Sequence, residues 1–97
     1  MSASPVPGPN FILGQIVATP NAVTAMNAAG VLPVDLLQRH VAGDWGTLPV
    51  EDIASNEQAL QIGARLLSSY PIGGDAKVWL ITEADRSSTT LLLPEDY

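Results

Sequence analysis

The chain contains a single histidine, His40, so any imidazole chemistry, whether as acid, base or ligand, depends on that one side chain. Two arginines, Arg65 and Arg86, supply cations for a developing negative charge, and Tyr97 adds a phenolic hydroxyl. Together these are the residue types that metal-independent cleavage of a phosphodiester needs, a proton shuttle and cations on the phosphate. The alternative is that His40 lies at a helix end, where it covers part of the core or interacts with the helix dipole.

The most distinctive short string is GDWG at residues 43–46, where a tryptophan lies between two glycines in a loop that joins two predicted helices. Because an exposed tryptophan is costly, two interpretations follow. Either Trp45 folds back as a lid on the core, or it acts together with Asp44 as part of a recognition surface, since aromatic anchors dominate the binding energy of interfaces. Both residues are candidate binding residues.

A second polar cluster lies in the segment from residue 82 to residue 90 (TEADRSSTT), which combines two carboxylates, one guanidinium and five hydroxyls around one predicted turn. Such a density of polar groups can bind an oxyanion or a backbone. Turns are polar by default, however, and Asp85 can simply cap its own turn. We retain Glu83, Asp85 and Arg86 as candidate binding residues on this basis.

Composition excludes several classes of site. The 97 residues include no cysteine, which rules out disulfides, thiolate zinc sites, iron–sulfur clusters and cysteine nucleophiles. No EF-hand loop, H-x-x-x-H, H-E-x-x-H or G-x-S-x-G string occurs, and the Gly73-Gly74 pair lies between predicted strands, as in a hairpin and unlike a nucleotide cradle. We expect no metal and no cofactor. Only 4 Lys+Arg against 10 Asp+Glu argue against binding to nucleic acid.

Hydrophobic periodicity and capping residues predict an α+β fold in the order β-α-α-α-β-β-β. The predicted strands are Phe11–Thr19, Tyr70–Ile72, Lys77–Glu83 and Thr89–Leu93, and the predicted helices run from Pro20 to a stop at Gly30, from Pro33 to a stop at Gly43, and from about Pro49 to Leu67. The last three strands should form an antiparallel meander packed on the helices, with the first strand at or beside it.

Three positions within these elements carry specific expectations. Asn56 falls on the apolar stripe of the longest helix, so it should bond to something specific inside or lie at the edge of the buried face. Gly63, placed within the same helix, suggests a close approach by another element. Trp79 lies in an apolar strand and is expected in the core.

The chain is expected to form one domain over residues 11–97, preceded by a flexible proline-rich arm at residues 1–10. No signal peptide and no apolar run near the ~18 residues of a spanning helix is apparent, which predicts no membrane association and a cytoplasmic location.

Several blocks resemble, in order, a family of small bacterial proteins of plasmids, integrative elements and genomic islands. The blocks are LGQIVATP, LLQRHVAGDWG, EDIASNEQAL, GARLLSSY and WLITEADRSSTTLLLPEDY, and they extend from about Leu13 to Tyr97. Members are labelled plasmid-related, or in some cases as a type I restriction endonuclease methylation subunit, although a chain of this length has no room for a methyltransferase domain. The resemblance implies a mobile-element setting and carries over no catalytic residues.

Two function classes follow. The first is a non-enzymatic accessory protein of a bacterial mobile genetic element that binds an unidentified protein partner, for instance in defence or counter-defence. The second is a metal-independent ribonuclease or an inactive relative, because the order of elements is similar to that of RelE/barnase-like folds. In that case His40 would shuttle protons, Arg65 and Arg86 would hold the phosphate beside Tyr97, and all must reach one substrate.

A homo-oligomer is a further expectation, since the chain is small and 46% hydrophobic. The pairing surface would be an exposed edge strand, either Phe11–Thr19 or Thr89–Leu93.

Overall fold

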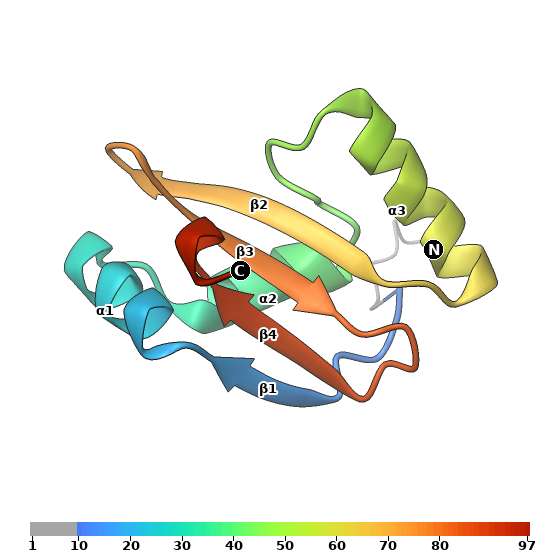
Figure 1. The fold of residues 1–97 in the computed structure, drawn as a ribbon, viewed down its shortest axis with the longest axis horizontal. Coiled ribbons are helices and arrows are strands. Elements are labelled where there is room, and N and C mark those ends of the chain that lie inside the picture. The colour runs from blue at the N-terminus through green and yellow to red at the C-terminus, as the bar shows by residue number, and fades with distance from the viewer. Residues whose placement is uncertain (1–9) are drawn as a thin grey trace, which may run out of the picture.

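A computed structural model describes residues 10–97, and the predicted α+β class and order of elements are confirmed (Figure 1). The elements are β1 (Gln15–Ala18), α1 (Pro20–Ala29), α2 (Pro33–Val41), α3 (Val50–Ile62), β2 (Leu66–Gly73), β3 (Ala76–Thr82), β4 (Ser88–Leu92) and a 3-10 turn, η1 (Pro94–Asp96). The predicted arm at residues 1–10 lies outside the described residues except for Asn10, whose N–H donates to the carbonyl of Val41 at the end of α2.

The four strands form one mixed sheet in the order β1-β4-β3-β2. The antiparallel meander of β2, β3 and β4 is confirmed, and β1 adds to it in parallel beside β4. Because β4 lies between β1 and β3, the expectation that Thr89–Leu93 is an exposed edge is wrong. The other expected edge segment, Phe11–Thr19, does form an edge, but only Gln15–Ala18 has strand geometry.

Local signals set the first two helices. Thr19 accepts a hydrogen bond from the N–H of Ala22 and caps α1, while Gly30 ends it in the left-handed conformation (φ 70°). Helix α2 begins at Pro33, as predicted. The expectation that the third helix runs to Leu67 is wrong, because Gly63 is left-handed (φ 73°) and ends α3, after which β2 begins. Gly63 is therefore a helix stop and marks no close approach by another element.

One face of the sheet is covered by α1 and α2. The cluster buried there consists of Ala22, Met26, Leu36, Tyr70, Val78, Leu80 and Leu91. Helix α3 packs beside β2 around a second cluster of Trp45, Ala59 and Leu66. Figure 1 shows α2 passing behind the sheet, whereas η1 lies in front of it. We call this second face, which no α-helix of residues 10–97 covers, the open face.

The outer edge of β2 is already paired. The Asn56 side chain donates to the carbonyl of Leu67 (2.6 Å) and accepts from its N–H (3.1 Å), as a neighbouring strand would. Two residues further along, the N–H of Ser69 donates to the carbonyl of Trp45 (3.1 Å), and the Ser69 carbonyl accepts from the N–H of Thr47 (2.9 Å). Asn56 thus fulfils the expectation that it bonds to something specific inside.

Gly46 permits this pairing. It has a left-handed conformation (φ 79°), and a Cβ atom placed on it would lie 1.9 Å from the carbonyl oxygen of Ser69. No side chain fits at that separation. Gly46 of the GDWG loop is therefore required by the fold, independently of any partner.

Asn56→Ala tests the contribution of the side-chain amide. We expect the free energy of unfolding in urea to fall by about 2 kcal/mol, because both backbone groups of Leu67 lose their partner. Ser55→Ala is the matched control on the exposed side of α3, and we expect it to change stability by less than about 0.5 kcal/mol. Equal losses in the two variants would contradict the assignment.

Candidate functional site

His40 is fully buried at the centre of a chain of side-chain hydrogen bonds. Its Nδ1 meets the hydroxyl of Ser68 on β2, and its Nε2 lies 2.9 Å from Oγ1 of Thr82 on β3. Thr82 in turn bonds to Thr89 on β4 (2.7 Å), and Thr89 donates to the carbonyl of Leu13 (2.7 Å). The network therefore joins α2, three strands and the segment that leads into β1.

The hydroxyl protons fix the tautomer of the imidazole. Thr89 uses its single proton on the carbonyl of Leu13, so Thr82 must donate to Thr89 and can only accept from His40. His40 therefore carries its proton on Nε2, and its Nδ1 accepts from Ser68. Both ring nitrogens are occupied, which leaves neither of them for a substrate.

The surroundings of His40 disfavour its charged form. Burial, and secondly the positive charge of Arg86, lower its pKa from 6.5 to about 4. The rings of Phe11 and Trp45 meet the imidazole edge-on, with centroids 5.1 and 5.6 Å away. The imidazole is a neutral part of the core. The expectation of a helix-end histidine over the core matches this position, whereas a proton shuttle would have to reach solvent.

Arg86 is committed to backbone carbonyls. Its guanidinium donates to Ala59 (3.2 Å) and Ala64 (2.6 Å) at the C-terminal end of α3 and to Glu83 (3.1 Å). A cation there compensates the negative end of the helix dipole. Arg86 also has a left-handed backbone (φ 61°), which is rare outside glycine.

Trp45 is a lid on the core. Its side chain is buried, stacks on Phe11 (6.2 Å between centroids) and donates from Nε1 to the carboxylate of Glu57 (2.8 Å). Asp44 pairs with Arg39 (2.7 Å) at the surface, and the ion pair lowers the pKa of its carboxyl. Of the two interpretations of the GDWG loop, the structure supports the lid.

The remaining candidate residues lie around the β3–β4 turn and on the open face. Asp85 accepts from the N–H of Ser87 and caps this turn (3.0 Å). Arg65 donates to the hydroxyl of Tyr97 (3.3 Å) and lies 3.7 Å from Glu83. The structure thus brings Arg65, Tyr97 and Glu83 together. It does not bring them to His40, which bonds on the helix-covered face, so the four residues of the ribonuclease hypothesis do not surround one substrate position.

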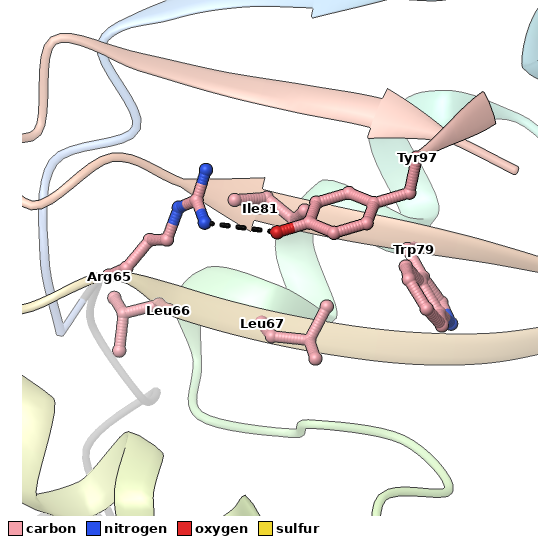
Figure 2. A pocket seen from close by; sticks show the side chains of 6 residues that line it. All are labelled: Arg65, Leu66, Leu67, Trp79, Ile81 and Tyr97. Carbon is pink, nitrogen blue, oxygen red and sulfur yellow. Dashed lines mark hydrogen bonds between the residues drawn. The ribbon is translucent and has the colours of Figure 1, made fainter. Parts of the chain in front are cut away.

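A groove of about 290 Å³ runs along β2 and β3 on the open face (Figure 2). It is lined by Arg65, Leu66, Leu67, Trp79, Ile81 and Tyr97. In Figure 2 Arg65 extends toward the Tyr97 hydroxyl from one end of the groove, and Trp79 lies at the other end, 5.9 Å from the Tyr97 ring between centroids. The groove is apolar at its base and offers hydrogen-bonding groups at one end.

The expectation that Trp79 is a core residue is wrong. Its side chain points to the open face, where its cross-strand neighbours are Ser69 on β2 and Leu92 on β4, and it is half-buried. The alternation of β3 contained the signal, because Lys77, Trp79 and Ile81 fall on one face and Val78 and Leu80 on the other. Both faces are apolar, so the sequence alone does not tell which of them the helices cover.

The described residues hold neither a metal-binding cluster nor a membrane-spanning helix. Within residues 10–97, no group of three or more His, Asp or Glu side chains is placed to hold a metal ion. None of the helices in that part of the chain is long and apolar enough to cross a membrane. Comparison with models of protein families, with curated proteins and with solved structures finds no match.

The buried imidazole predicts a specific pH dependence of stability. The unfolded chain takes up a proton near pH 6.5 and the folded chain only near pH 4, so the unfolded state holds more protons between these values. The contribution is complete above pH 6.5 and is lost as the pH falls toward 4. We expect the free energy of unfolding to drop by roughly 3 kcal/mol across this window, since one pKa unit corresponds to about 1.4 kcal/mol.

His40→Gln is the diagnostic variant, measured by urea unfolding at several pH values. It removes the titrating group and should flatten the profile, although the variant starts from a lower stability at pH 7. The lowered pKa values of the Asp44, Asp85 and Asp96 carboxyls mean that their contributions to stability are present above pH 3.8 and are lost only as the pH falls below it, outside this window. A slope that persists in His40→Gln would refute the assignment.

Proposed function

We propose that this protein is a non-enzymatic interaction module that binds a protein partner through the groove on its open face. The observation that carries the proposal is the groove itself, where Leu67, Trp79 and Ile81 form an apolar base that no α-helix of residues 10–97 covers. Half-buried aromatic residues in concave sites are the usual anchors of protein interfaces.

The chemistry of the groove suggests the kind of partner. An apolar side chain fits between Trp79 and Leu67, and a hydrogen-bond acceptor beside it can meet the guanidinium of Arg65, whose side chain is about half exposed. Tyr97 is 71% exposed and lies over the groove, so its ring can move aside or close over the incoming side chain. These features favour a segment with an apolar anchor next to a carbonyl or carboxylate.

The residues of the catalytic alternative support the same proposal. His40 has no free nitrogen and Arg86 is held by carbonyls, so the strongest candidates for acid–base and phosphate chemistry serve the fold. A setting on a mobile genetic element, in defence or counter-defence, remains part of the proposal through the resemblance of the sequence blocks alone.

Selection of peptides from a display library tests this function and needs no identified partner. We expect enriched peptides to share an apolar anchor beside an acceptor and to bind at least about tenfold more weakly to Trp79→Ala, since truncation of a hot-spot residue costs about 2 kcal/mol or more. Fluorescence anisotropy of a dye-labelled peptide gives the affinity, because this readout does not depend on the tryptophan that the variant removes.

Val50→Ala is the control, because Val50 is an exposed apolar residue on α3, away from the lining of the groove. Selected peptides should bind this variant as they bind the unchanged protein. Peptides that bind Trp79→Ala with unchanged affinity would exclude the groove as the binding site.

A further inference from the structure

Within residues 10–97, strand β1 presents an unpaired edge. The N–H groups of Gln15 and Thr19 donate to β4, at the carbonyls of Ser87 and Leu91 (both 2.9 Å). By the alternation of a parallel ladder, Ile16 and Ala18 direct their N–H and C=O groups away from the sheet. Among residues 10–97, no group bonds to these outward donors and acceptors.

At the opposite edge of the sheet, the outward backbone groups of β2 are bonded or blocked, so β1 is the edge at which another strand can pair. On β2 the outward residues are Leu67, Ser69 and Pro71. The first is paired by Asn56, the second by the loop at Gly46, and the third has no N–H to donate. The protein thus shields one edge at three successive positions. On β1 it has no proline, charge or bulge that would do the same.

The distribution of charge favours contact between two copies at this edge. The first 34 residues contain no Asp, Glu, Lys, Arg or His, so the whole net charge of −6 is carried from Asp35 onward. Two copies that meet at β1 therefore bring no charged side chain of that strand together. The carboxylate close to its end, that of Asp96, already accepts from Thr19 (2.7 Å) and Asn21 (2.8 Å).

The side chains of the edge are apolar and accessible. Ile16 is 45% exposed and Val17 is 43% exposed, on opposite faces of the sheet. Apolar cross-strand pairs stabilise adjacent strands, so a partner strand with the same residues gains contacts with Ile16 on one face and with Val17 on the other. The segment Gln15–Ala18 is complementary to itself in this sense.

We propose that a second copy of the chain pairs with β1 in antiparallel orientation about a twofold axis at Val17. In this register Ile16 faces Ala18 of the other copy, and the two valines face each other. Each of the two Ile16–Ala18 pairs exchanges two backbone hydrogen bonds, which gives four in total. The two sheets become one, and both open faces lie on the same side of it.

Sedimentation equilibrium over about 1 to 500 µM protein, the range of weak specific association, tests this pairing. We expect the mass to rise to twice that of the monomer as the concentration increases. Ile16→Pro removes an outward N–H and leaves the ladder to β4 intact, and Val17→Lys places two like charges opposite each other. Each change should weaken dimerisation at least about tenfold, since it removes or opposes contacts worth more than about 1.4 kcal/mol in sum.

Val50→Lys is the matched control, because it introduces the same charge at an 80% exposed valine on α3. It should dimerise like the unchanged protein.

Hydrogen exchange provides a second measurement, in which the Ala18 amide becomes protected at high concentration in the unchanged protein and not in Val17→Lys. Circular dichroism checks that each variant is folded, and Val17→Lys remains informative if the proline disrupts β1.

Two results would overturn the proposal. The first is a protein that stays monomeric up to the highest concentration, which would leave the edge to a strand of a different protein. The second is a dimer that Val17→Lys and Ile16→Pro leave unchanged, since the copies would then meet elsewhere.

Discussion

The hydrogen-bond chain through the imidazole of His40 is the constraint on which the arrangement of the elements depends. Helix α2 contributes the imidazole, β2, β3 and β4 each contribute a hydroxyl, and the last acceptor is the carbonyl of Leu13 just before β1. The four side chains are buried, so the loss of one of them leaves its neighbour unsatisfied in a medium of low dielectric. The network therefore helps to specify which strands are neighbours and how α2 crosses them. Aliphatic contacts are less directional and tolerate several packing arrangements.

The residues that are the best candidates for chemistry in the sequence have structural roles in the folded protein. His40 is enclosed, Arg86 satisfies the end of α3, and Trp45 closes the core against Phe11. Among the candidate residues, Arg65 and Tyr97 stay accessible and border the groove on the open face, where we propose that a partner binds.

The parts of the fold that depend on local signals were predictable. Thr19 and Gly30 delimit α1 because capping acts within a few residues, and the meander follows from turns between successive strands. The parallel addition of β1 to β4 joins residues about 70 positions apart, and the role of Gly63 depends on a backbone conformation that composition does not reveal. The groove escaped prediction for a related reason, since Trp79 and Leu80 are equally apolar and only the packing of helices decides which of them faces outward.

The asymmetry between the two edges of the sheet bears on how far the protein can assemble. A sheet with two open edges can add copies at both sides and grow into a fibre. Here the outer edge of β2 is blocked by Asn56, the loop at Gly46 and Pro71, so another strand can add at β1 only. A twofold dimer formed at β1 has a blocked β2 edge on each side. Its sheet therefore stops at eight strands, twice the four of one chain. One side-chain amide thus contributes both to the stability of a strand and to the colloidal stability of the protein.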